Sequence, residues 1–279
     1  MRWRRGRMSR DIEDRRGRRG FGAPAAIGGL GVPGLIIFVV ITLLGGGGLG
    51  DVVTDLEGGG PPPAGSAPSA EDQRLADFLS FVLDDVQGSW ERSFDQSGKK
   101  YERARLVLFD HSTGSGCGGA TSNIGPHYCP PDQTVYIDLD FFRALKRQFG
   151  APGDFAQAYV LAHEIAHHVQ NVLGISDEVR AEQRSDPDRA NELSVLLELQ
   201  ADCLAGVWGN TAADRKLLEP GDLEEGLAAA AAVGDDRIQE QAGRDVDRES
   251  WTHGSSEQRV SWFRRGFDSG DPAECDTFS

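Results

Sequence analysis

Long apolar runs are scarce in this sequence of 279 residues. Apolar residues make up 39% of the chain, while glycine occupies 36 positions and proline 13. Only one uncharged apolar run is long enough to cross a bilayer, which excludes a polytopic membrane protein. Internal repeats are also absent. The length allows one catalytic domain with attachments or two small domains, and it is ample for a hydrophobic core.

No charged residue occurs between Phe21 and Gly50, and this gap separates two regions of opposite sign. Residues 1–20 contain nine arginines and three acidic residues, a net charge of +6. Residues 51–279 contain the remaining 20 basic and 41 acidic residues, a net charge of −21. Because an acidic domain repels phosphate backbones, the sequence predicts no nucleic acid as a partner of the body of the protein.

The uncharged gap contains an apolar stretch over residues 27–44, IGGLGVPGLIIFVVITLL. As a helix it would rise about 27 Å, close to the hydrocarbon thickness of a bilayer. A cleaved signal peptide is the alternative, but Gly45 and the glycines after it offer no A-x-A cleavage pattern. We expect a single transmembrane helix over 27–49 that anchors the protein in the lipid bilayer. Since arginines stay in the cytoplasm, we expect a basic cytoplasmic arm over 1–20 and an extracytoplasmic domain at the cell membrane.

The remaining chain divides into a linker and one folded domain. Residues 51–70 predict the linker, since they include a stretch that contains only Gly, Pro, Ala and Ser. The domain over 71–279 should have one or two short strands in front of a helical body, a predominantly helical α+β fold. We expect strands at 104–109 and 134–139, and helices at 71–94, 154–173, 188–210, 222–233, 235–241 and 255–269. The second strand is expected to offer an edge for an extended peptide.

The four cysteines predict two disulfides, because an even number of cysteines in an extracytoplasmic domain is typical of paired thiols. Four cysteines allow three pairings. We expect Cys117 to pair with Cys129, which would pin the glycine-rich loop between them. Cys203 would then pair with Cys275 and tie the end of the chain to a helix. A zinc site that joins the first two cysteines to His111 or His127 is the alternative, but the cysteines lack the close spacing of structural zinc sites.

An H-E-x-x-H motif, His163-Glu164-Ile165-Ala166-His167, lies in the most strongly helical segment of the chain. Side chains four residues apart lie one above the other on the same helix face, so His163 and His167 can bind one zinc ion. Glu164 lies beside this pair, where a carboxylate can accept the proton of a water whose pKa the ion has lowered.

A third ligand should come from another element, with a fourth position left for water. The segment Glu198-Leu199-Gln200-Ala201-Asp202 supplies a candidate on the next predicted helix. Its neighbours are mostly apolar, so Glu198 and Asp202 should be buried, and buried carboxylates need a cation. We expect Glu198 to bind the metal and Asp202 to accept the second ring N–H of His163.

Three long segments of the chain resemble a known family. They are GAPGDFAQAYVLAHEIAHHVQNVLGI, ANELSVLLELQADCLAGVW and THGSSEQRVSWFRRGF. The H-E-x-x-H and E-x-x-x-D pattern resembles the gluzincin branch of the zincins, and the segments are similar to the putative neutral zinc metallopeptidase family of bacterial membrane-anchored proteins. The resemblance covers nearly the whole chain. It implies a cell-envelope protein with a zincin-like catalytic domain, and it brings no substrate.

A zincin also needs a donor for the developing oxyanion. His253 is the candidate, with Tyr136 and Tyr159 as further possibilities, although His253 also fits a helix-start residue near the cap Ser255. His168 points about 100° away from His167 on the helix, so we expect it to pack or to form hydrogen bonds rather than to bind metal.

These features predict a membrane-anchored metallopeptidase with one Zn²⁺ per chain, a peptide or protein as substrate, and Glu164 as general base. The alternative is a non-hydrolytic zinc-binding protein of the cell envelope. Glu164 argues against it, because a structural zinc site has no use for that carboxylate and normally closes its fourth position with a ligand. A tethered interaction module without metal would require both motifs to be coincidental.

Overall fold

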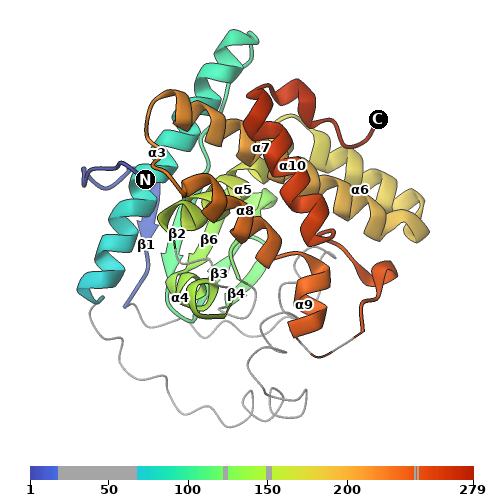
Figure 1. Cartoon of the computed structure of the whole chain (residues 1–279), viewed down its shortest axis with the longest axis horizontal. Helices are drawn as coiled ribbons and strands as arrows, with labels where there is room; N and C mark the ends of the chain where they lie inside the picture. The colour runs from blue at the N-terminus through green and yellow to red at the C-terminus, as the bar shows by residue number, and fades with distance from the viewer. Residues whose placement is uncertain (18–67, 122–124, 149–152, 242, 244) are drawn as a thin grey trace.

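Figure 1 shows the computed structural model of the chain, which describes residues 1–17, 68–121, 125–148, 153–241, 243 and 245–279. The described part has a mostly helical α+β architecture with small sheets. Within these ranges no helix is both long and apolar enough to cross a bilayer. The anchor predicted over 27–49 and most of the linker predicted over 51–70 lie outside the described residues.

The larger sheet has four strands in the order β1-β2-β6-β5. Strands β1, β2 and β6 run parallel, and β5 pairs antiparallel with β6. The bounds are β1 Ile12–Asp14, β2 Arg105–Phe109, β5 His127–Cys129 and β6 Thr134–Asp138. All five residues of β6 are buried. Because β6 is paired on both sides, the expectation that it offers an edge to a peptide is wrong.

A second sheet is a hairpin of β3, Ser112–Ser115, and β4, Gly118–Thr121. The described residues therefore contain six strands, where the sequence predicted one or two. The missed strands have three or four residues each, and the hairpin is rich in glycine and serine, so neither hydrophobic alternation nor β-propensity identifies them.

The helices that frame the site agree with the prediction within a few residues. They are α3 Ala70–Gln96, α5 Asp154–Val172, α7 Ala190–Asp214, α8 Asp222–Ala232, α9 Asp235–Gln241 and α10 Ser256–Ser269. Ser69 and Ser255 begin α3 and α10 with capping boxes. Two helices were not predicted, α4 Leu139–Gln148, which begins inside an expected strand, and the polar α6 Ile175–Ser185.

Helix α5 packs against α3, α7 and α8, and α10 lies along α7 (Figure 1). Two glycines let α7 and α10 touch backbone to backbone. A Cβ atom on Gly206 would lie 2.1 Å from the carbonyl oxygen of Phe263, and one on Gly266 would lie 1.9 Å from that of Cys203. Any side chain at these positions would push the helices apart. The close crossing brings residues of α10 to the buried face that α5 and α7 share.

Both predicted disulfides are confirmed. Cys117–Cys129 joins the β3–β4 hairpin to the end of β5, so these cysteines do not form the alternative zinc site. Cys203–Cys275 ties the C-terminal segment to α7, beside the residues expected to bind metal.

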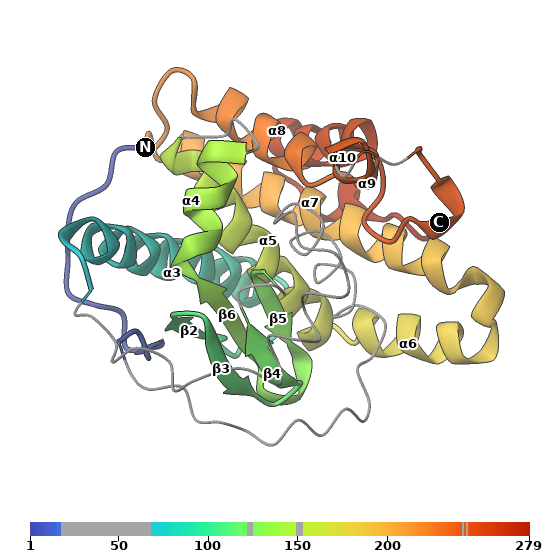
Figure 2. The same ribbon diagram turned by 90° about the horizontal axis from the view of Figure 1, so that it is seen from below.

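The first 17 residues, expected in a cytoplasmic arm, lie on the folded domain. In Figure 2 they run as a blue segment past α3, and they end in β1, which extends the sheet beyond β2. The ring of Trp3 packs against Phe78 of α3 at a centroid distance of 5.3 Å. This segment is therefore part of the domain's structure in the described chain.

Candidate active site

The structure brings the three predicted metal ligands together. His163 and His167 lie one turn apart on α5, with ring centroids 4.7 Å apart and ring planes nearly perpendicular. Glu198 reaches both rings from α7. Its Oε2 lies 3.1 Å from His163 Nε2, and its Oε1 lies 3.3 Å from His167 Nε2. The carboxylate of Glu198 thus faces the Nε2 atoms of both histidines.

These distances fit a zinc ion. Zinc bonds of about 2.0–2.2 Å in a tetrahedron separate neighbouring ligand atoms by about 3.3–3.6 Å. His163, His167 and Glu198 each offer a ligand atom, and these atoms all lie within 4.8 Å of one another. Two nitrogens and one carboxylate oxygen are also the donor set of known catalytic zinc sites, which keep a fourth position open.

Asp202, one helical turn after Glu198, holds His163 from the other side. Its Oδ1 lies 2.9 Å from His163 Nδ1, so that nitrogen carries the proton and Nε2 is left for a metal. Tyr159 donates its hydroxyl hydrogen to the same oxygen. Asp202 is fully buried, as the sequence predicted.

Arg259 of α10 balances the charge of Asp202. Its guanidinium donates from Nε to Oδ2 at 2.7 Å and from Nη2 to Oδ1 at 2.9 Å. Burial raises the pKa of Asp202, but the charges of Arg259 and His163 outweigh it and lower the pKa. Arg259 Nη2 also lies 4.0 Å from Glu198 Oε2, but its hydrogen bonds go to Asp202, so the carboxylate of Glu198 remains available to a cation held by the two histidines.

The pKa shifts of His163 and Glu198 also indicate that this cluster favours positive charge. Burial lowers the pKa of His163, but Asp202 and Glu198 outweigh it and raise the pKa to about 10. Burial likewise raises the pKa of Glu198, but His167 and His163 bring the pKa well below its ordinary value. Without another cation the carboxylates thus keep a proton on His163, and a metal that bound there would release it.

A hydrogen-bonded glutamine, which the sequence analysis missed, orients His167. Gln170 Oε1 lies 2.8 Å from His167 Nδ1, and its amide nitrogen donates to the carbonyl oxygen of Leu197 in α7 at 2.7 Å. Gln170 therefore fixes the ring and joins α5 to α7. Its spacing of three residues from His167 places it on the same helix face, and this spacing was the signal available in the sequence.

His253, the predicted oxyanion donor, lies in the turn before α10 rather than in the helix. Its Nδ1 lies 3.0 Å from Asp235 Oδ1 at the start of α9. Ser255, not His253, caps α10. Burial lowers the pKa of His253, but its hydrogen bond to Asp235 and the charge of Glu198 outweigh it and raise the pKa. The ring is therefore within electrostatic reach of Glu198.

The remaining candidates occupy different positions. Glu164 follows His163 on α5 and is only 6% exposed. The hydroxyl of Tyr159 donates to Asp202, and that of Tyr136 donates to Asp132, so both are engaged as donors elsewhere. His168 contacts Tyr128 and a backbone carbonyl oxygen through its two ring nitrogens, which agrees with the hydrogen-bonding role expected for it.

Sequence comparisons relate the chain to bacterial proteins. The chain is 46% identical over 285 residues to "Uncharacterized protein YpfJ" of Escherichia coli K12, covering 100% of this chain and 99% of that protein. It is 50% identical over 190 residues to "Uncharacterized protein Mb2605" of Mycobacterium bovis, covering 64% of each. No solved structure matches the chain. A family model described as "Putative neutral zinc metallopeptidase" matches residues 1–278, and the chain belongs to this family.

Proposed function

We propose that the protein is a zinc-dependent peptidase whose metal is held by His163, His167 and Glu198. The observation that carries this proposal is the convergence of both Nε2 atoms on the carboxylate of Glu198. Its Oε2 lies 3.1 Å from His163 Nε2 and its Oε1 lies 3.3 Å from His167 Nε2, close to the spacing of ligand atoms around one zinc ion. The membership in a family described as a zinc metallopeptidase supports both the metal and the peptide substrate.

In this proposal the chain's own residues handle the protons and orient the reacting groups. When bound, zinc supplies Lewis-acid chemistry for a peptide carbonyl and a water. Glu164 takes a proton from the attacking water and returns it to the leaving amine. His253, held at Nδ1 by Asp235, donates from Nε2 to the developing oxyanion, and its raised pKa keeps it in the donating form.

The edge strand β5 is the place we propose for an extended peptide. It lies on the outside of the sheet next to α5. Tyr128 of β5 is fixed to α5, because its hydroxyl lies 2.9 Å from His168 Nδ1 and accepts from Asn171 at 3.2 Å. Main-chain pairing along this edge would hold a substrate beside the helix that carries the H-E-x-x-H motif.

Two matched glutamate variants of the full chain test the proposal. Glu198→Gln should lose both zinc and peptide hydrolysis, whereas Glu164→Gln should keep about one zinc per chain and lose hydrolysis. Zinc is measured by elemental analysis of folded protein and hydrolysis with a mixture of quenched fluorogenic peptides. Full zinc occupancy in folded Glu198→Gln would refute the ligand assignment. Zinc binding without hydrolysis in the parent would favour a non-hydrolytic zinc protein.

A further inference from the structure

The N-terminal segment, residues 1–17, forms backbone hydrogen bonds with the domain that follows the apolar stretch. Strand β1 pairs in parallel with β2, with Ile12 opposite Leu106 and Asp14 opposite Leu108. At the two ends of this pairing, Leu106 N donates to the carbonyl oxygen of Asp11 and Arg15 N to that of Leu108, each at 2.8 Å. The segment thus covers an edge of the sheet that would otherwise expose unpaired backbone groups.

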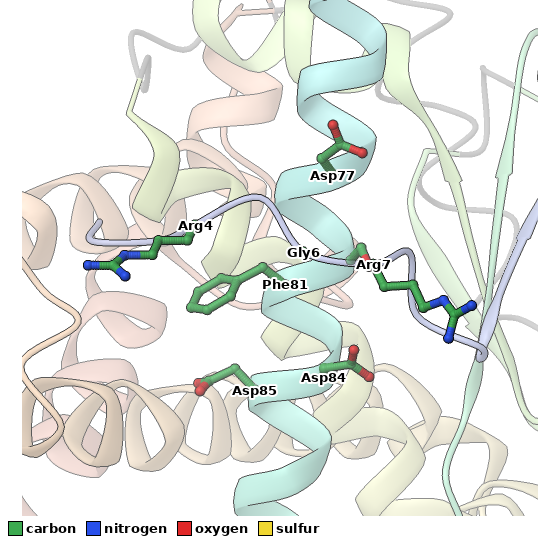
Figure 3. Close-up of a pocket in the computed structure, with 8 residues that line it drawn as sticks. Arg4, Gly6, Arg7, Asp77, Phe81, Asp84 and Asp85 are labelled. Atoms are coloured by element: carbon green, nitrogen blue, oxygen red, sulfur yellow. The ribbon is translucent and has the colours of Figure 1, made fainter.

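Side chains of the N-terminal segment also fit α3. Figure 3 shows the segment crossing α3, with Arg4 and Arg7 on the segment and Asp77, Asp84 and Asp85 on the helix. Along this contact Ser9 N donates to Ser80 Oγ at 2.7 Å, and Ser9 Oγ donates to Asp84 at 2.8 Å. These are buried or partly buried contacts between residues 71 and 75 positions apart in the chain.

Two arginines of the segment, Arg5 and Arg16, contact acidic or carbonyl groups of α3. The side chain of Arg16 is only 1% exposed, and its Nη1 donates to the carbonyl oxygen of Asp72 at 2.8 Å. Arg5 pairs with Asp77 of α3 at 2.7 Å, and Asp11 receives Arg103 of the domain at 2.6 Å. A buried arginine that binds a domain carbonyl is not a solvated topogenic charge, because its guanidinium has exchanged water for the protein.

We infer that the N-terminal segment and the catalytic domain fold together in one aqueous compartment. The pairing of β1 with β2 and the contact of the buried Arg16 with α3 cannot form if the two partners lie on opposite sides of a bilayer. A shared compartment differs from the opposite sides that the positive-inside rule predicts for these two regions, and the inference is independent of the proposed function. Residues 1–17 contain seven arginines and three acidic residues, a net charge of +4, and the −21 charge of residues 51–279 favours the association.

Two variants of the full chain, each with one added cysteine, test the shared compartment. Arg10 and Lys100 are 87% and 85% exposed, and replacing either removes one positive charge, so Arg10→Cys and Lys100→Cys are matched. The four native cysteines form two disulfides, so the added cysteine supplies the free thiol, and the parent chain is the control for background labelling. Intact cells are treated with a membrane-impermeant maleimide before and after permeabilisation. We expect both variants to be labelled under the same condition. Labelling of one before and the other only after permeabilisation would overturn the inference.

A crosslink tests the contact itself in cells. In Ser9→Cys/Ser80→Cys the two thiols should join on mild oxidation, because Ser9 N and Ser80 Oγ lie 2.7 Å apart. The matched control is Ser9→Cys/Ser89→Cys, in which the second cysteine lies about 13 Å farther along α3 and should not join. The crosslink is read from the gel mobility of protein cleaved between residues 17 and 68. Absence of the Ser9–Ser80 crosslink in folded protein would also overturn the inference.

Discussion

Two buried histidine–aspartate pairs lie near each other, and they are built in different ways. His163 pairs with Asp202 at 2.9 Å, and His253 pairs with Asp235 at 3.0 Å. Both bonds use Nδ1, and in both the aspartate raises the pKa of the histidine. The first pair joins two long helices, whereas the second joins a short helix to a turn.

The difference lies in what else the two aspartates bind. Asp202 receives the guanidinium of Arg259 and the hydroxyl of Tyr159, both from other helices. Asp235 instead receives three consecutive backbone N–H groups, from Thr252, His253 and Gly254. Side-chain partners from several helices fix an imidazole relative to a metal, while a backbone turn fixes one relative to its own loop. The first pair therefore suits a histidine that binds a metal, and the second suits a histidine that donates a hydrogen bond to the substrate.

Replacing each histidine should give the largest difference between the two pairs, in zinc content and in peptide hydrolysis. His163→Ala removes a proposed zinc ligand, so it should leave no zinc bound at one equivalent and no hydrolysis. His253→Ala should keep zinc and lower kcat by about 10²–10³, the cost of removing one oxyanion donor. Elemental analysis and peptide kinetics measure both quantities. Loss of zinc from a folded His253→Ala variant would show that the second pair also supports the metal.

Replacing the two aspartates should give a smaller contrast. Asp202→Asn removes the charged partner of a proposed ligand and should weaken zinc binding by about 10–100-fold. Asp235→Asn should leave zinc affinity unchanged. Competition with a chromophoric chelator measures the affinities, on folded protein only, because breaking the buried Asp202–Arg259 pair should also lower stability by roughly 3–5 kcal/mol. Equal affinities in the two variants would contradict the distinction between the pairs.

Gln170→Ala tests the uncharged hydrogen-bond partner of His167, the second proposed histidine ligand. It removes the hydrogen bond to His167 Nδ1 but no charge, so we expect a loss of zinc affinity near the lower end, about 10-fold. Gln170→Glu keeps an acceptor at the same position and should retain more affinity than the alanine variant. The same chelator competition orders the two, and the reverse order would count against a role in orienting the ring.

The smallest expected effect is a pH-dependent difference in stability between the parent and Asp235→Asn. The pKa of Asp235 is lowered on folding, so its contribution is complete above its ordinary value of 3.8 and is lost as the pH falls through the lowered pKa. The pKa of His253 is raised, so its contribution is complete below 6.5 and is lost as the pH rises through the raised pKa. The difference should reach roughly 1.5–3 kcal/mol between these values.

Thermal or urea unfolding at pH 3, 5.5 and 9 measures this difference. It should be largest at the middle pH and decrease on both sides. A difference that is constant over this range would indicate that Asp235 acts only through uncharged hydrogen bonds. Asp177→Asn, at an exposed position of α6, is the control and should change stability little at any of the three pH values.

The sequence predicted the residues that regular spacing or burial identifies. His163 and His167 follow from a four-residue helical spacing, and Glu198 follows from a carboxylate on an apolar helix. Arg259 could not be predicted. It contacts Asp202 only because α10 crosses α7, and the two residues lie 57 positions apart in the sequence. Asp235 was read only as a helix start, since nothing local indicates that it receives the turn at His253.

The N-terminal segment shows what a count of charges along the sequence leaves out. Its arginines were counted as topogenic charges, a rule that depends on their remaining in water. The structure instead buries Arg16 and pairs β1 with β2, and a three-residue strand carries too little pattern to predict. Charge along a sequence therefore indicates a membrane orientation only for side chains that stay solvated.

The backbone contact of α7 with α10 has a consequence for how the protein tolerates mutation. Gly206 and Gly266 bind nothing, yet a single methyl group at either would collide with a carbonyl oxygen of the other helix. Separating the helices would withdraw Arg259 from Asp202 and leave two opposite charges buried apart. Selection on metal binding should thus extend to two positions that carry no functional group, and random mutagenesis for lost zinc should recover substitutions there.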